Sequence, residues 1–188
     1  MKIIGITGTL GAGKGTIVDY LIRHYGYEHF SVRGYLIDEA KKRGMGLNRD
    51  TYVVVANDLR AKFGPSYITD QLYLQAAEKG VNAVIESVRT PGEVESLRKH
   101  EHFLLFGVDA DPKIRYGRVV NRASETDQIS FETFMENEQR EMSSFDPNHQ
   151  NIGRCMQMAD YVFTNNGDFQ DLYRQVEQVL GSADYDNE

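Results

Sequence analysis

The stretch GTLGAGKGT, residues 8–16, decides the fold of this chain. It follows an apolar, β-rich run and leads into TIVDYLIRHYG (16–26), whose apolar residues recur at helical spacing. Gly8 and the pair Gly13-Lys14 match the pattern G-x-x-x-x-G-K, set between a strand and a helix as that pattern requires. Glycines let successive backbone N–H groups turn toward a bound anion, and the helix N-terminus adds partial positive charge. The stretch therefore predicts a loop that holds the phosphates of a nucleotide, since a plain glycine turn would not need the lysine in register.

The residues after the lysine depart from the general pattern. The next position usually carries a serine or threonine that binds magnesium, whereas here Gly15 stands there and Thr16 follows. The spelling G-x-x-G-x-G-K-G-T resembles the loop of the adenylate-kinase-like nucleoside monophosphate kinases. This resemblance implies ATP and Mg²⁺ as cofactors, with Thr16 serving the metal and water completing much of its shell. The expected ATP-binding residues of the loop are Gly8, Gly11, Ala12, Gly13, Lys14, Gly15 and Thr16.

Strand-like and helix-like segments alternate along the rest of the chain. The apolar, β-rich runs lie at residues 2–7, 27–32, 81–87, 102–110 and 160–165. Most are apolar throughout instead of at every second residue, which is typical of strands covered on both faces. Segments with helical spacing separate the runs, and this alternation favours parallel strands with helices on both sides. The sequence thus predicts an α/β fold with a doubly wound, mainly parallel five-stranded sheet.

Two long helical segments, residues 33–79 and 111–158, are inserted into this alternation. Both follow the carboxyl ends of predicted strands, where open α/β sheets bind ligands. We expect the first insert to bind the acceptor of a transferred group and the second to contain a lid. Residues 1–182 are expected to form a single domain of the P-loop kinase type, and the acidic tail 183–188 is expected to be disordered.

The composition limits the partners and the compartment. Lys plus Arg number 21 against 28 Asp plus Glu, so the formal net charge is −7 and the surface should repel nucleic acid and anionic membranes. Cys155 is the only cysteine, and no apolar stretch approaches the roughly 20 residues of a membrane span. We expect a cytoplasmic protein, monomeric or homodimeric, that binds small-molecule nucleotides and has no nucleic-acid or membrane partner.

Arginines in the second insert are the expected catalytic groups beside Lys14. Arg115, Arg118 and Arg122 are spaced i, i+3 and i+7, so one face of a helix would present all three. Phosphoryl transfer depends on positioning and positive charge more than on covalent chemistry by the protein, and a lid must keep water out. The alternative is a basic helix face in contact with solvent. The position of these arginines, directly after a predicted strand near the glycine loop, favours the lid.

Glu86 and Arg89 stand where another predicted strand ends. A carboxylate at that edge suits an acceptor-binding group or a ligand that holds Mg²⁺ through water. The E-S-V-R-T segment is similar to the D-G-x-x-R segment of monophosphate kinases, whose arginine binds the acceptor phosphate. The alternative is that Arg89 pairs with Glu93 or Glu95 on the next helix.

Further pieces, E-A-K-K-R-G, A-N-D-L-R and M-A-D-Y-V-F-T-N-N-G, extend the resemblance over most of the chain, although only the glycine loop is highly specific. They resemble a family of small bacterial and archaeal P-loop proteins described as nucleoside-kinase-like or dephospho-CoA-kinase-like. Monophosphate kinases often carry T-G-D-x-x-R after the second strand, whereas this chain has Ile37 at the arginine position. Arg33 or Arg60 would then supply the charge that holds the acceptor. Asn165 follows the last strand, where related kinases contact the adenine ring.

Three functions remain open. The favoured one is ATP-dependent phosphoryl transfer to a small phosphorylated acceptor, a nucleoside or deoxynucleoside monophosphate. The second is dephospho-CoA kinase, which the missing D-A-D segment after the second strand disfavours. The third is a non-catalytic ATP-binding switch, which would need no second site lined by arginines. The chain has no N-K-x-D element of a guanine-specific switch, and 188 residues are too few for a typical AAA+ ATPase with its lid domain.

Overall fold

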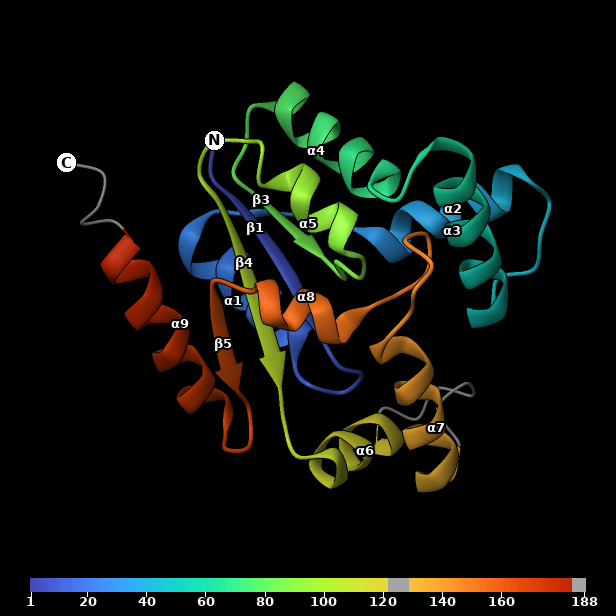
Figure 1. The fold of residues 1–188 in the computed structure, drawn as a ribbon. Coiled ribbons are helices and arrows are strands. Elements are labelled where there is room, and N and C mark those ends of the chain that lie inside the picture. The colour runs from blue at the N-terminus through green and yellow to red at the C-terminus, as the bar shows by residue number, and fades with distance from the viewer. Residues whose placement is uncertain (122–128, 184–188) are drawn as a thin grey trace.

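A five-stranded sheet forms the centre of the computed structural model, which describes residues 1–121 and 129–183 (Figure 1). Its strand order is β2-β3-β1-β4-β5, and every neighbouring pair is parallel. The strands are β1 (Ile3–Gly8), β2 (Glu28–Ser31), β3 (Ala83–Glu86), β4 (Phe103–Asp109) and β5 (Tyr161–Thr164). Each apolar run of the sequence forms one strand, and the predicted doubly wound α/β fold is confirmed.

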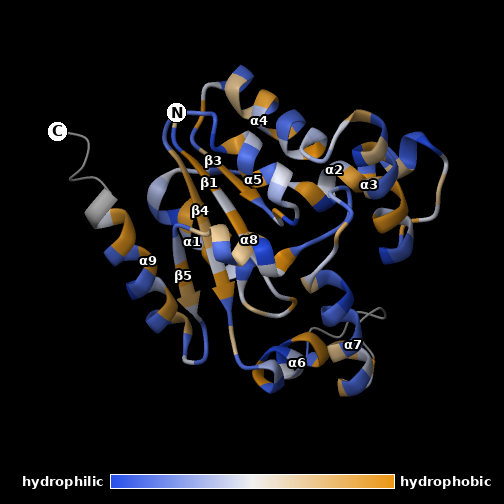
Figure 2. Ribbon diagram, viewed as in Figure 1, coloured by the Kyte–Doolittle hydropathy of each residue, from blue (hydrophilic) through white to orange (hydrophobic). Residues whose placement is uncertain are grey.

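Both faces of the sheet are buried, which explains why the strands are apolar throughout. Ile3 and Leu105 belong to one buried cluster, whereas their chain neighbours Ile4 and Phe106 belong to the other, because alternate residues of a strand point to opposite faces. Figure 2 shows hydrophobic residues along the strands and mixed colours on the helices that cover them. The covering helices are α1 (Lys14–Tyr25) and α9 (Phe169–Ala183) on one face, and α4 (Tyr67–Lys79), α5 (Pro91–Leu97) and α8 (Ile152–Met158) on the other.

Helix α1 begins directly at the glycine loop. Gly13 precedes it with a φ of 108°, and Gly26 ends it with a φ of 67° and an N–H group bonded to the carbonyl oxygen of Leu21. Ile17 and Leu21 are fully buried in the core. The loop is therefore held between a buried strand and a buried helix.

The first insert is helical, as predicted, and two breaks divide it. It contains α2 (Val32–Lys42) and α3 (Arg49–Phe63) before α4. Helix α4 covers the sheet on the way to β3, with Ile68 and Leu72 buried. The cleft described below is lined by residues of α2 and α3 and by none of α4, so α2 and α3 are the part of this insert that fits the expected acceptor-binding role.

The second insert also divides into two parts. Helices α6 (Pro112–Asn121) and α7 (Phe131–Met142) lie beyond the carboxyl ends of the strands, whereas α8 returns to the sheet (Figure 1). Cys155 of α8 is fully buried. Residues 122–128 and 184–188, which include most of the expected acidic tail, lie outside the described residues. No helix within the described ranges is long and apolar enough to cross a membrane.

Candidate functional site

A cleft of about 490 Å³ lies at the carboxyl edge of the sheet, between the glycine loop and helices α2 and α3. Open α/β sheets bind their ligands at this edge. The walls combine apolar side chains with charged groups from segments far apart in the sequence. The charged and polar groups that line it include Lys14, Arg33, Arg49, Arg60, Glu86, Ser87, Arg89, Glu141 and Gln150.

Close contacts shape the glycine loop and leave no room for side chains at two of its positions. Gly11 and Gly13 have φ values of 80° and 108°, and a Cβ at Gly11 would lie 2.6 Å from the carbonyl oxygen of Arg115. Lys14 Nζ donates hydrogen bonds to the carbonyl oxygens of Gly8, at 2.9 Å, and Thr9, at 2.8 Å. The lysine charge thus lies over a preformed loop, which is the geometry that phosphate binding needs.

The side chain of Asn165 holds the backbone of the glycine loop by a hydrogen bond. The residue is 2% exposed, and its Nδ2 donates a hydrogen bond of 2.7 Å to the carbonyl oxygen of Ala12. A Cβ at Gly13 would lie 2.2 Å from the same Nδ2 atom, so the amide fills the space that a side chain there would need. The backbone N–H of Asn165 also donates to Asp109 O at 2.8 Å. The sequence predicted contact of the segment around Asn165 with adenine, and the structure adds that the side-chain amide holds the backbone of the glycine loop.

Arg118 contacts the same loop. Its Nη2 donates a hydrogen bond of 2.8 Å to Asn165 O, and its Nη1 lies 3.5 Å from Gly11 O. The side chain therefore spans the glycine loop and the loop after β5. Arg122, the third expected lid arginine, lies outside the described residues.

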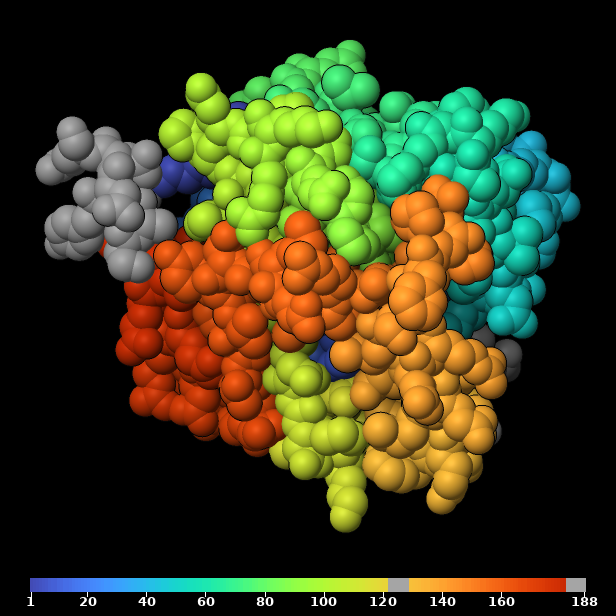
Figure 3. Space-filling view, in the orientation of Figure 1, coloured from blue at the N-terminus to red at the C-terminus, as the bar shows by residue number. Residues whose placement is uncertain are grey.

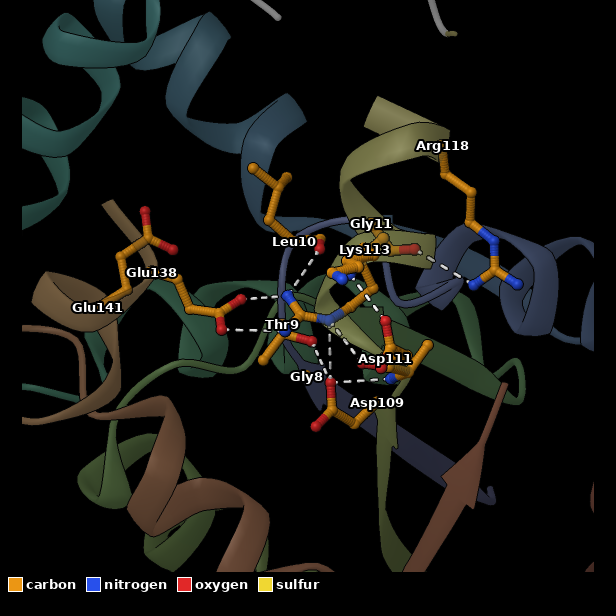
Figure 4. Close-up of polar contacts among 12 residues, drawn as sticks. Gly8, Thr9, Leu10, Gly11, Asp109, Asp111, Lys113, Arg118, Glu138 and Glu141 are labelled. Carbon is orange, nitrogen blue, oxygen red and sulfur yellow. Dashed lines mark hydrogen bonds and ion pairs between the residues drawn. The ribbon is translucent and has the colours of Figure 1, made fainter. Parts of the chain in front are cut away.

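Arg115 corrects the expectation that one helix face presents all the lid arginines. Its side chain is 2% exposed, and both guanidinium Nη atoms bond to the carboxylate of Glu138 on α7. It also donates to Ala110 O at 2.8 Å and to Leu10 O at 3.3 Å. Figure 4 shows its partners Leu10 and Glu138 on the same side of the glycine loop. Arg115 is thus a buried link between the glycine loop and α7.

The surface of the molecule is hollowed beside these elements. Figure 3 shows the blue N-terminal segment at the bottom of a hollow between the yellow-green and orange segments.

Glu86 ends β3 with Oε2 3.2 Å from Nε2 of His29. Burial alone would raise the pKa of its carboxyl, but the hydrogen bond from His29 and the charges of Lys14, His29 and Arg89 hold that pKa below its ordinary value. The carboxylate is therefore ionised at neutral pH beside the loop lysine. Thr16, in the first turn of α1, adds a half-buried hydroxyl. Carboxylate and hydroxyl oxygens are the type of donor that Mg²⁺ takes when it keeps several of its waters.

An unusual turn after β3 carries the chain into the cleft. Ser87 has a φ of 73°, which is uncommon for a residue with a Cβ, and its N–H donates to Ile6 O at 3.0 Å. The backbone N–H of Arg89 donates to Glu93 Oε2 at 2.7 Å. The pairing of Arg89 with Glu93 is therefore made by the backbone, and the guanidinium is left for other partners.

The Arg89 guanidinium lies at the cleft wall and meets residues that the sequence did not single out. Its Nη1 donates to Gln150 Oε1 at 2.6 Å and lies 3.2 Å from Glu141 Oε2. Arg49, the first residue of α3, bonds to the other oxygen of Glu141. No motif marks Arg49, Glu141 or Gln150, because their contacts join positions 52 to 92 residues apart.

Arg60 also differs from its expected role, which was to hold the acceptor. Its side chain is 2% exposed and forms an ion pair of 2.9 Å with Glu93, which is fully buried. Glu93 thus compensates the charge of Arg60, which leaves Arg60 unsuited to the expected role of holding the acceptor. Arg33 remains at the cleft wall, with its guanidinium carbon 6.0 Å from the ring centroid of Tyr52.

The fold and this site define a nucleotide-binding protein of the P-loop class with the fold of P-loop kinases. A family model described as an AAA domain matches residues 4–143, which contain the glycine loop. The chain therefore contains an AAA-type P-loop domain.

Relatives identify the family. A UPF0200 protein of Methanococcus maripaludis strain S2 is 32% identical over 183 residues, which cover 96% of this chain and 96% of that protein. A UPF0200 protein of Methanocaldococcus jannaschii is 31% identical over 183 residues, which cover 96% of this chain and 89% of that protein. The chain belongs to the UPF0200 family.

Solved structures support the fold. The chain is similar to TT1252 from Thermus thermophilus, with a TM-score of 0.62, 22% identity and coverage of 96% of this chain and 97% of that one. It is similar to shikimate kinase from Bacteroides thetaiotaomicron, with a TM-score of 0.60, 13% identity and coverage of 96% and 98%. A sugar kinase from Janibacter gives a TM-score of 0.55 at 15% identity, with coverage of 96% and 95%. At these identities the likeness concerns the fold alone.

Proposed function

We propose that this protein transfers a phosphoryl group from ATP to a small phosphorylated acceptor, a nucleoside or deoxynucleoside monophosphate. The observation that carries the proposal is the two-sided cleft. Lys14 and the glycine loop form one wall, and Arg33, Arg49 and Arg89 stand among the residues that line the rest. A loop for one set of phosphates and separate arginines for another anion are what transfer between two nucleotides needs.

Each group of the site has a role that follows from its position. The glycine loop binds the phosphates through backbone N–H groups, and Lys14 neutralises charge on the transferring phosphoryl. Arg118 and Asn165 hold the loop in shape. Mg²⁺, held through water by Thr16 and Glu86, would neutralise charge on the phosphates when bound. The net charge of −7 supports small-molecule partners over nucleic acid or a membrane surface, in keeping with a cytoplasmic enzyme.

The alternatives differ in the second site. Dephospho-CoA kinase would use the same loop with another acceptor. A non-catalytic ATP-binding switch would have no use for arginines opposite Lys14, which is why the cleft supports the kinase. Two of the similar structures are named for acceptors without a phosphate, shikimate and a sugar. The test therefore includes acceptors with a hydroxyl group and no phosphate.

The test is ADP release in a coupled assay with ATP and Mg²⁺. The panel contains the common ribo- and deoxynucleoside monophosphates, dephospho-CoA, shikimate and simple sugars. We expect turnover with one or more monophosphates. Lys14→Ala should lower kcat by about 10²–10³, because it removes charge that stabilises the transition state.

A matched control is Lys113→Ala, which removes an exposed lysine of α6 and should leave turnover unchanged. Turnover with dephospho-CoA or an unphosphorylated acceptor would move the assignment to that kinase. ATP binding without turnover on any acceptor would favour the switch. A Lys14→Ala variant that keeps more than about a tenth of wild-type turnover would contradict the proposed role of the loop.

A further inference from the structure

Glu141 lies among the arginines that face the cleft. It is the next-to-last residue of α7, its side chain is 16% exposed, and its two oxygens go to different partners. Oε1 bonds to Arg49 at the start of α3, and Oε2 lies 3.2 Å from Nη1 of Arg89 after β3. One carboxylate of the chain thus bridges two guanidiniums that belong to separate parts of the cleft wall.

The bridge leaves much of the donor capacity of both arginines unused. A guanidinium has five N–H donors in a planar fork, and each arginine gives the carboxylate a single hydrogen bond here. A phosphate offers three oxygens and more negative charge, so it can accept a bidentate pair from each arginine. Arg89 also donates to Gln150 at 2.6 Å, which fixes the direction of its fork. The two arginines therefore form an anion site that the chain fills with a weaker anion of its own.

We propose that Arg49 and Arg89 together bind the phosphate of the acceptor, and that Glu141 occupies this site until the acceptor displaces it. The identity of the ligand rests on the proposed function, whereas the site itself rests on the contacts just described. Arg49 is then a binding residue for the acceptor. Glu141 competes with the acceptor phosphate for the two arginines and so lowers the affinity of the site for other anions.

Displacement of Glu141 has a second effect through α7. Glu138 lies three residues earlier on the same helix and bonds to Arg115, which in turn donates to Leu10 O of the glycine loop. Figure 4 shows that Glu138 points toward the glycine loop and that Glu141 points away from it. Helix α7 thus carries one carboxylate for each of the two substrate sites, and release of Glu141 frees its end from α3.

The test measures binding of inorganic phosphate and needs no turnover. MgADP at saturating concentration occupies the glycine loop, and phosphate is then titrated by calorimetry or ³¹P NMR. Glu141→Gln keeps the shape of the side chain and removes its charge. We expect phosphate to bind this variant about tenfold more tightly than the wild type, because the internal competitor has lost its charge-assisted bonds.

Two further variants separate the site from a general change of charge. Glu136→Gln removes the same charge from an exposed position of α7 and should leave phosphate affinity at the wild-type value. The double variant Arg49→Ala/Glu141→Gln should lose the gain of Glu141→Gln. The proposal is overturned if Glu141→Gln binds phosphate no more tightly than Glu136→Gln, or if the double variant retains the gain.

The outcome is distinguishable from failure of the proposed function. Tighter phosphate binding by Glu141→Gln, together with no turnover on any acceptor of the panel, would keep the anion site and reject the kinase. Turnover with a monophosphate whose KM is equal in the wild type, Glu141→Gln and Arg49→Ala would keep the kinase and reject this site.

Discussion

Replacement of Arg60 by methionine tests whether this arginine holds the fold or the acceptor. Methionine keeps much of the aliphatic volume and removes the guanidinium. Glu93, which is fully buried, would then keep its negative charge without the partner at 2.9 Å. Breaking a buried ion pair from one side costs about 3–5 kcal/mol, because the remaining charge stays in a poorly solvated site.

The structure places the expected cost at the lower end of that range. Glu93 also accepts hydrogen bonds from the backbone N–H groups of Arg89, at 2.7 Å, and Thr90, at 3.1 Å, and both survive the substitution. We therefore expect the free energy of unfolding to fall by about 3 kcal/mol. For a chain of this length that loss lowers Tm by roughly 6–12 °C.

Urea unfolding followed by far-UV circular dichroism measures this loss, since the chain has no tryptophan to report by fluorescence. Arg43→Met is the matched control. Arg43 pairs with Glu39 and Asp58 at the surface, where such pairs contribute at most about 1 kcal/mol. Arg60→Met/Glu93→Gln should regain part of the loss, because no buried charge is left alone. A loss below about 1 kcal/mol for Arg60→Met, combined with a raised KM for the acceptor, would refute the reasoning and return Arg60 to the acceptor site.

The remaining predictions concern the loop and the core. Gly13→Ala should abolish measurable ATP binding, because a Cβ there would lie 2.2 Å from Asn165 Nδ2 and the φ of 108° disfavours alanine; a calorimetric titration that gives the wild-type affinity would contradict this. Arg118→Ala should weaken ATP binding and kcat together, each about tenfold, since its bonds hold the loop before any lid closes; a loss in kcat alone would support a lid role instead. Burial, with the charge of Glu93, raises the pKa of the Cys155 thiol to about 12, so iodoacetamide should label the native protein only as fast as it opens. Labelling at the rate of a free thiol would show that α8 is not packed as described.

The strands and the glycine loop could be predicted from the sequence because their signals are local. An apolar run buried on both faces and a loop that needs glycine at fixed positions each leave their pattern within a few residues. Gly8, Gly13 and Lys14 stand where the motif puts them, and β1 precedes them.

The roles of the arginines could not be predicted from the sequence, because they depend on partners that are distant along the chain. Spacing placed Arg115 and Arg118 on one turn of a helix, but it could not show that Glu138 covers Arg115. Arg60 looked available because its partner Glu93 lies 33 positions away, within the cap of another helix. The number of arginines in the sequence therefore overstates the positive charge that the cleft offers to a ligand. Only the folded structure shows which arginines are already paired.

The bond between Asn165 and Ala12 joins residues 153 positions apart. Ribosomes add about 5–20 residues per second, so roughly 8–30 s separate synthesis of the loop from synthesis of the amide that braces it. During that interval the nascent chain carries the glycine motif without the contact that fixes its shape. The structure of the loop therefore depends on a contact that forms only after the last strand of the sheet has been synthesised.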